Sequence, residues 1–307
     1  MSTEVLLHAF IGVDHGVLNP ALFRHFLSYY RRLGVSRIVL DLQTNSQDGA
    51  RVDEFSRIAH SFGAEIRGVI NEPYSAHLVQ IPRINDFLRE SVGTNDWALL
   101  ADADEFIEFP TKLNEFLKIA DRRSQNLLLG TMIDRLSLSP AFPVVSNDRS
   151  LDDTFPFAYP LTRQIRRGWD RKIVAIRGSA VRALGGQLLH EGRHALATSR
   201  DYAAAEREVR MDKLVDLIPS RWIGGAMRAM LPRRGVISDG VRPRGGRLRV
   251  HHFAWDSLLR EKMETRLRVD SGGTYPLELR KVLKFINAAS PREHLRPWLL
   301  RRISVGA

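Results

Sequence analysis

Residues 97–107 read Trp-Ala-Leu-Leu-Ala-Asp-Ala-Asp-Glu-Phe-Ile, an apolar run that leads directly into a group of acids. A short apolar run of this kind predicts a strand buried in a parallel sheet. Asp102 and Asp104 are two residues apart, so on an extended chain their side chains point to the same side. Carboxylate oxygens are the ligands that Mg²⁺ and Mn²⁺ prefer. The stretch therefore predicts a divalent-cation site at the end of a strand; the ordinary alternative is a strand that ends in a polar turn.

Strand and helix patterns alternate upstream of this stretch. Strands are predicted over 5–11, 37–42, 65–70 and 97–101, with helices between them over 21–33, 50–62 and 81–91. The first helix has clear limits, because Asn19 is a good N-cap, Pro20 suits the first helical position and Gly34 suits the stop. Such alternation with short connections predicts a parallel sheet wound with crossover helices. Ligands of these sheets bind beyond the carboxyl ends of the strands, where the acids at 102–105 fall.

The pattern changes downstream of the acids. A helix is predicted over 112–120, strands are predicted over 126–134, 155–165, 172–177 and 247–253, and a helical region begins at Asp256 and breaks near Ser271–Gly273. The whole chain predicts an α/β fold with a wound mixed sheet flanked by helices. Three parts are expected: a core over 1–197, a basic insertion or appendage over 198–246, and a final core strand with C-terminal helices over 247–307.

Composition narrows the class of protein. The 307 residues are 44% hydrophobic, enough for a large core, and they include no cysteine, which excludes disulfides and thiolate metal sites. No apolar run approaches the roughly 18 residues that span a bilayer, and the N-terminus lacks the basic start of a secretory signal. We therefore expect a cytoplasmic protein.

The net charge of +11 favours polyanions or anionic lipid as partners, although no zinc-finger or basic-heptad pattern indicates nucleic acid. The arginines are densest over 221–249, where Trp222, Met227 and Leu231 lie among them. We expect this segment to face the acceptor or the inner face of the membrane, with peripheral association through anionic lipid. The ordinary alternative is a solvated helix packed on the sheet, with Trp222 in the core.

Several segments together resemble one enzyme family. Residues 97–107 resemble the D-x-D-E-F strand of the family-two-like glycosyltransferases with the GT-A fold, the nucleotide-diphospho-sugar transferase fold. Residues 33–49 resemble that family's second strand and N-x-S-x-D-G loop, with extra residues between Asp41 and Asn45. Residues 83–85 resemble its R-x-N pair, and Ile-Asp-Arg-Leu at 133–136 and Val-His-His-Phe-Ala-Trp at 250–255 resemble later segments of the D-x-D-E-F subgroup. The resemblance covers about residues 5–177 and 247–268.

The resemblance implies roles for individual residues. Asp104 is the expected direct ligand of the metal, and Asp102 is expected to bind the ribose or a metal-bound water. The residues expected to contact the nucleotide are Asp41, Asp48, Arg83 and Asn85. Asp48 has an ordinary alternative as the N-cap of the helix over 50–62. The ordinary alternative for Arg83 is a position on a solvated face of its helix.

The late histidines and the catalytic base leave alternatives open. His251 and His252 are adjacent on a predicted strand, so they face opposite sides, and only one of them can complete the metal shell. An inverting transferase needs a carboxylate to deprotonate the acceptor hydroxyl, and the candidates are Glu191, which follows Gly185-Gly186, and Asp134. An ordinary ion pair with an arginine is the alternative for each, and a retaining enzyme would need no such base.

The sequence therefore predicts a metal-dependent glycosyltransferase. It would move a sugar from a nucleoside-diphosphate sugar to a hydroxyl of a glycan or lipid-linked acceptor, as in polysaccharide biosynthesis, with Mn²⁺ or Mg²⁺ as its cofactor. A nucleotidyltransferase on a similar fold is the first alternative, but residues 10–16 offer only two isolated glycines for a phosphate loop. A non-catalytic polyanion-binding protein is the second, and it leaves the acids at the strand ends unexplained.

Overall fold

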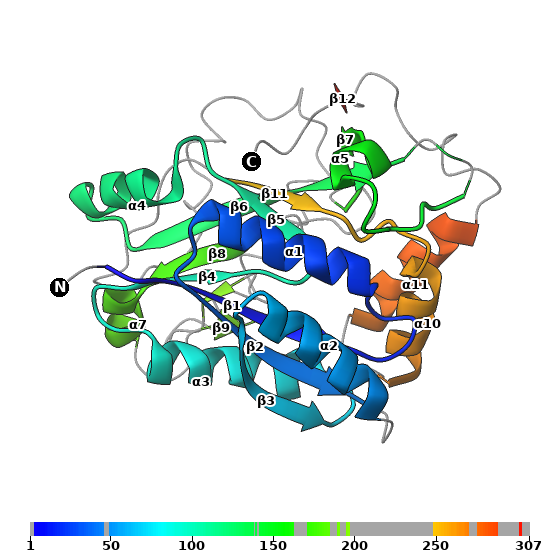
Figure 1. Cartoon of the computed structure of the whole chain (residues 1–307), viewed down its shortest axis with the longest axis horizontal. Helices are drawn as coiled ribbons and strands as arrows, with labels where there is room; N and C mark the ends of the chain where they lie inside the picture. The colour runs from blue at the N-terminus through cyan, green and yellow to red at the C-terminus, as the bar shows by residue number, and fades with distance from the viewer. Residues whose placement is uncertain are drawn as a thin grey trace, which may run out of the picture.

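The structure is a computed structural model, and it describes residues 3–45, 49–137, 139, 141–162, 171–184, 189–190, 195–196, 248–269, 275–287 and 301–302. A mixed sheet of ten strands forms the centre of the described chain, with helices packed on both of its faces (Figure 1). The α/β class with a mixed, helix-flanked sheet was predicted from the sequence, and it is confirmed.

The N-terminal half supplies the parallel part of the sheet. Four neighbouring strands run in the order β4-β1-β2-β3, and each adjacent pair is parallel. They are β1 (Val5–Gly12), β2 (Arg37–Thr44), β3 (Glu65–Asn71) and β4 (Trp97–Leu100). The crossovers contain α1 (Pro20–Leu33), α2 (Gly49–Ser61), the short η1 (Ala76–Gln80) and α3 (Ile81–Ser91). Asn19 caps α1 through its side chain, and Gly34 ends the helix with a positive φ of 93°, both as predicted.

The remaining strands make the sheet mixed. Beside β4 the order continues β8-β6-β7-β12, with antiparallel pairs throughout. These strands are β6 (Leu127–Leu136), β7 (Phe157–Tyr159), β8 (Arg171–Arg177) and β12 (Arg301–Arg302). β7 covers only part of the strand predicted over 155–165. A separate two-stranded sheet joins β9 (Leu189–His190) and β10 (Ala195–Leu196).

One late strand returns to the centre of the sheet. β11 (Leu248–His252) lies parallel to β6 and antiparallel to β5 (Glu105–Glu108), a short strand that directly follows the acids. Two strands that lie far apart in the sequence, β5 and β11, therefore meet beside residues 102–105. The late strand was predicted over 247–253, but β5 was not, because its four residues alternate too briefly to stand out.

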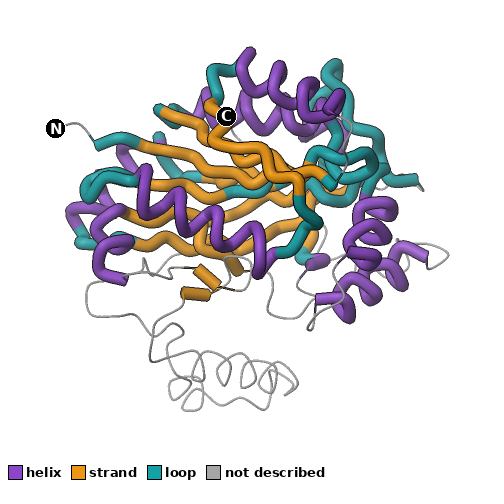
Figure 2. The backbone as a smooth tube through the Cα atoms, turned by 90° about the horizontal axis from the view of Figure 1, so that it is seen from below, coloured by secondary structure: helices purple, strands orange, loops and turns teal. Residues whose placement is uncertain are grey.

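Alternation along β1 divides the core between the two faces of the sheet. Val5, Leu7 and Ala9 belong to a large cluster that also contains the apolar residues of α1, of α2 and of α4 (Leu113–Arg122). Leu6 points to the other face and belongs to a cluster with α3 and α7 (Gly178–Leu184). The helices thus lie in two layers with the sheet between them (Figure 2).

The two C-terminal helices form a third packing unit with the end of β6. α10 (Leu259–Val269) and α11 (Tyr275–Asn287) pack with Leu136, Tyr159 and Trp255, and a short α5 (Leu151–Thr154) precedes β7. The break predicted near Ser271–Gly273 lies outside the described residues. Among the described residues, no helix combines the length and the apolarity that crossing a membrane requires.

Candidate functional site

The acids of the D-x-D stretch meet at the carboxyl end of β4. Asp102 and Asp104 lie in the turn between β4 and β5, Glu105 opens β5, and one oxygen from each lies within 4.8 Å of the others. The turn is held by the Glu105 amide, which donates to the Asp102 carbonyl at 2.9 Å. Ala103 is buried. Glu105 had no predicted role, and the turn brings its side chain into the cluster.

Two lysines bind this acidic cluster (Asp102, Asp104 and Glu105). The Lys172 ammonium, from β8, lies 3.0 Å from Asp102 Oδ2 and also contacts Glu105. The Lys262 ammonium, from α10, lies 2.7 Å from Asp104 Oδ2. Neither lysine belongs to a recognisable motif, so sequence patterns gave no signal for them. Two positive charges therefore face three negative ones.

Asp104 stays ionised although it is enclosed. Its side chain is only 9% exposed, and burial alone would raise the pKa of its carboxyl group. The charge of the Lys262 ammonium, assisted by the adjacent His252 ring, outweighs burial and holds the pKa of Asp104 well below its ordinary value. Asp104 is thus an anion at neutral pH, as a cation ligand must be.

His252 is the late histidine that lies beside the cluster. Its Nε2 atom is 3.9 Å from Asp104 Oδ2, and its Nδ1 atom is 2.9 Å from Asp134 Oδ1. An ionised aspartate only accepts hydrogen bonds, so the Nδ1 atom of His252 must carry the proton that it donates to Asp134. In the neutral ring, Nε2 then carries a lone pair on the side of Asp104. Metal-binding histidines are commonly oriented by a carboxylate in this way.

Asp134 is a positioning residue, which corrects its prediction as a catalytic base. Its carboxylate is fully buried and accepts hydrogen bonds from four donors. These are the Thr162 amide at 2.5 Å, the Thr162 hydroxyl at 2.7 Å, the Trp255 indole at 2.8 Å and the His252 ring at 2.9 Å. Burial would raise the pKa of Asp134, but the bonds from His252 and Thr162 outweigh it and lower the pKa. Since the carboxylate has no exposed surface, an acceptor hydroxyl cannot reach it in this structure.

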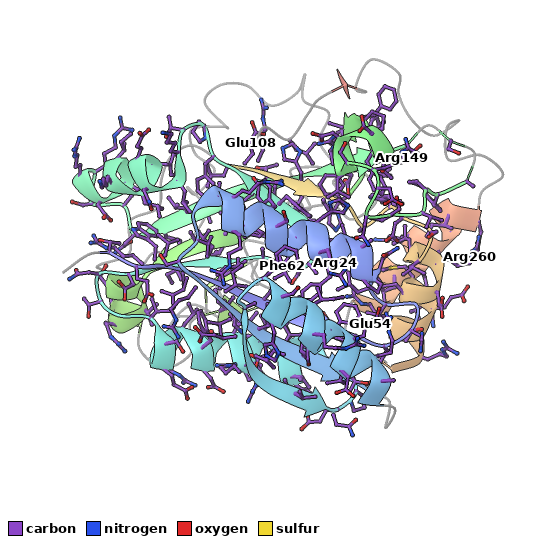
Figure 3. All side chains as sticks on the ribbon, in the orientation of Figure 1. Arg24, Glu54, Phe62, Glu108, Arg149 and Arg260 are labelled. Atoms are coloured by element: carbon purple, nitrogen blue, oxygen red, sulfur yellow. The ribbon has the colours of Figure 1, made fainter. Side chains whose placement is uncertain are left out.

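His251 faces away from the acidic cluster, so its candidacy as a metal ligand was wrong. Its ring is fully buried, with Nε2 2.9 Å from Glu108 Oε2 and Nδ1 3.4 Å from an Arg135 nitrogen. Glu108 comes from β5 and is labelled in Figure 3. Burial lowers the pKa of His251, which favours the neutral ring. The strand alternation that the sequence predicted is confirmed, and it selects His252.

Asp41 lies in the core, in a cluster of basic side chains. It is fully buried on β2 and contacts Arg67, the Arg83 guanidinium at 3.0 Å and the His8 ring at 3.0 Å. Burial would raise the pKa of Asp41, but the hydrogen bonds from His8 and Arg67 hold it at about 2. The contacts join β1, β2, β3 and α3, so Asp41 stabilises the fold. Arg83 keeps 35% of its side chain exposed, and it is the most exposed member of this group.

Asn85 also has a structural role. It is buried on α3, and its side chain accepts a hydrogen bond from the Leu189 amide at 3.0 Å and donates to the Leu189 carbonyl at 3.4 Å. These bonds fix β9 against α3, and both polar groups of the amide are used. The predicted contact between Asn85 and a nucleotide is therefore not supported by its position.

Three predictions fall outside the described residues. Asp48, Glu191 and the basic segment over 198–246 all lie there. β9 ends at His190, directly before Glu191.

The donor set fits a divalent cation. Ligands of an octahedral first-row ion or Mg²⁺ at about 2.1 Å lie roughly 3–4.2 Å apart. The separation of 3.9 Å between His252 Nε2 and Asp104 Oδ2 lies within these limits, and one oxygen from each of the three carboxylates lies within 4.8 Å of the others. Gln80 supports Asp102, since its amide nitrogen donates to Asp102 Oδ1 at 3.2 Å.

Comparisons with known proteins give limited likenesses. No family model matches the chain, and no curated protein matches it. Among solved structures, the chain is similar to S. aureus TarS, with a TM-score of 0.39 and 10% identity over 93% of this chain and 43% of TarS. It is also similar to TarS 1-349, with a TM-score of 0.33 and 8% identity over 93% of this chain and 73% of that one.

A third solved structure is 4-diphosphocytidyl-2C-methyl-D-erythritol synthase. Its TM-score is 0.34, at 13% identity over 69% of this chain and 100% of that one. Of the first of these structures, S. aureus TarS, this chain spans less than half the length. TM-scores this low support no functional conclusion. The function proposed below therefore rests on the side chains described above.

Proposed function

We propose that the chain is a glycosyltransferase of the GT-A type that uses a nucleoside-diphosphate sugar and a divalent cation. The observation that carries the proposal is the acidic cluster at the carboxyl end of β4, faced by His252, whose Nε2 atom lies 3.9 Å from Asp104 Oδ2. This is the edge of a wound sheet where ligands bind. Asp102, Asp104 and His252 are the proposed ligands, with Glu105 beside them.

The bound cation would neutralise the negative charge that develops on a departing nucleoside diphosphate. Residues of this chain would supply positive charge to that anion and would orient a ligand of the cation. Lys172 and Lys262 supply positive charge at the acidic cluster, and Asp134 fixes the His252 ring. Arg83 is the proposed contact to the nucleotide at the exposed end of the Asp41 group. Asp48 and Glu191 remain proposals as a nucleoside contact and as the base of an inverting reaction.

The acceptor is proposed to be a hydroxyl of a glycan or of a lipid-linked sugar. A net charge of +11 suits an acceptor at an anionic surface. We place the protein in the cytoplasm, at the inner face of the membrane.

A donor panel tests the proposal. Thermal unfolding is followed with UDP-, GDP-, CDP- and dTDP-sugars, each with and without Mn²⁺, and release of the nucleoside diphosphate is measured for any donor that stabilises the fold. Saturation at a hundredfold excess over Kd adds about 2.7 kcal/mol to the free energy of unfolding. We expect one donor to stabilise the protein only with Mn²⁺.

Adding nucleoside triphosphates, heparin and polyphosphate to the panel separates the alternatives. A nucleotidyltransferase would release pyrophosphate from a nucleoside triphosphate and would leave the diphosphate sugars intact. A polyanion-binding protein would be stabilised by heparin or polyphosphate at low salt, without any need for Mn²⁺. Either result would replace the glycosyltransferase assignment.

A further inference from the structure

The two lysines at the acidic cluster come from different parts of the fold. Lys172 lies on β8, which is hydrogen-bonded to β4 and β6 in the middle of the sheet. Lys262 lies on α10, which belongs to the C-terminal packing unit outside the sheet. Lys172 is therefore held by the sheet, whereas Lys262 reaches the cluster only through its own flexible stem.

α10 lies over the edge of the sheet at which ligands bind. Glu261 on α10 packs against Gly16, in the loop after β1, so closely that a side chain at Gly16 would overlap it. Arg266 on the same helix stacks on the ring of Tyr74, just after β3, at 4.8 Å. Between these contacts, Lys262 points at Asp104. The helix thus places one ammonium group above the carboxyl ends of β1, β3 and β4.

We propose that Lys262 is a phosphate-binding residue of the donor site, which binds Asp104 only until a divalent cation takes that carboxylate. The inference rests on the proposed function, because the donor supplies the phosphate. An ammonium group and a divalent cation repel each other, so both cannot hold the same Asp104 oxygen. A diphosphate on the cation is the nearest new anion, and the four-carbon stem of Lys262 lets its ammonium turn to it. Lys172 stays between Asp102 and Glu105.

Two titrations of Lys262→Met test this exchange, with inorganic pyrophosphate as the phosphate probe. Mn²⁺ affinity is measured first without any phosphate, by electron paramagnetic resonance. The variant is expected to bind Mn²⁺ about tenfold more tightly than the wild type, because the competing ammonium is gone. Pyrophosphate is then titrated at saturating Mn²⁺. The variant is expected to bind pyrophosphate at least about tenfold more weakly, because one charged hydrogen bond is lost.

Lys284→Met is the matched control. Lys284 is exposed on the neighbouring helix α11, so this variant makes the same charge change away from the acidic cluster. Both affinities should equal those of the wild type. A purely structural role for Lys262 predicts weaker binding of Mn²⁺ and pyrophosphate alike. That result, or an unchanged value in either titration of Lys262→Met, overturns the proposal.

Acetylation of the wild-type protein gives a second measurement that needs no variant. Acetic anhydride labelling with mass spectrometry reports how accessible each lysine is. Lys262 should be protected without ligands, become at least about threefold more reactive with Mn²⁺ alone, and be protected again with Mn²⁺ and pyrophosphate. Constant reactivity of Lys262 across the three conditions overturns the proposal. Lys172 should not change.

Nucleoside diphosphates separate this proposal from the proposed function. If the wild type binds Mn²⁺ and pyrophosphate but none of UDP, GDP, CDP and dTDP, the glycosyltransferase proposal fails and the role of Lys262 stands. If a nucleoside diphosphate binds with Mn²⁺ and Lys262→Met has no effect on that binding, the proposed role of Lys262 fails and the glycosyltransferase proposal stands.

Discussion

Asp134→Asn tests how His252 is held in place. The carboxylate of Asp134 is fully buried, with Oδ1 accepting from Thr162, Trp255 and His252, and Oδ2 accepting from the Thr162 amide. An asparagine has the same shape but one oxygen fewer. Its NH₂ group must therefore take the place of one of the two oxygens and face the donors there. The Oδ2 position has the fewest donors, because only the Thr162 amide donates to it.

The cost follows from that geometry. One hydrogen bond is lost and one buried donor is left unsatisfied, so the free energy of unfolding should fall by about 2–3 kcal/mol. For a chain of this size that lowers Tm by roughly 3–5 °C. His252 also loses its charged partner. Removing the carboxylate that orients a metal-bound histidine typically weakens metal binding by about 10- to 100-fold, and we expect a loss of Mn²⁺ affinity in that range.

Chemical denaturation and Mn²⁺ titration on the same protein check both effects. Asp121→Asn is the matched control, because Asp121 also accepts a tryptophan indole, from Trp97 at 3.1 Å, and pairs with Arg177 at 3.0 Å. It should lose stability and keep its Mn²⁺ affinity. If Asp134→Asn is destabilised but binds Mn²⁺ as the wild type does, His252 is not oriented for a metal. If its stability is unchanged, the four hydrogen bonds have been misjudged.

Three further predictions concern pH and lipid. The pKa of Asp41 is lowered to about 2, so Asp41 stabilises the fold above pH 4, and about 2.5 kcal/mol should be lost progressively as the pH falls from about 5 to about 1; Asp41→Asn should abolish that loss in acid unfolding curves. Burial raises the pKa of Asp256 to about 6, so its ionisation costs stability as the pH rises through 6. Asp256→Asn, in metal-free buffer, should match the wild type at pH 4 and exceed it by up to about 3 kcal/mol at pH 7.5, and equal stability at both pH values would refute the assignment. Co-sedimentation with anionic vesicles should be salt-sensitive and lost when Arg228, Arg233 and Arg234 are replaced together, whereas a wild type that ignores such vesicles would exclude lipid as the partner of that segment.

The sequence predicted the elements whose signals are local. Asn19, Pro20 and Gly34 set the limits of α1, and the apolar run from Trp97 predicted β4 together with the position of its acids. The alternation of His251 and His252 across the sheet followed from strand geometry alone. These features depend on a few neighbouring residues, so a single sequence contains them.

The contacts that complete the site depend on residues far apart in the chain. Lys172 and Lys262 are 67 and 158 residues from their partners Glu105 and Asp104, and no spacing rule connects them. Asp134 was mistaken for a base because its partners Thr162 and Trp255 are 28 and 121 residues away. Asp41 was expected to contact the nucleotide because residues 33–49 resemble the family's second strand and the loop after it. Its burial depends on Arg67 and Arg83, which only the folded chain brings together.

The central claim is that Asp104 holds a cation to which a nucleoside diphosphate binds. Isothermal titration of the nucleoside diphosphate selected by the donor panel, with and without Mn²⁺, tests it on the wild type, on Asp104→Asn and on Asp53→Asn, an exposed control on α2. The wild type and the control should bind the nucleotide only with Mn²⁺, and Asp104→Asn should lose at least about 100-fold in affinity while remaining folded. Unchanged, Mn²⁺-dependent binding by folded Asp104→Asn would contradict the account.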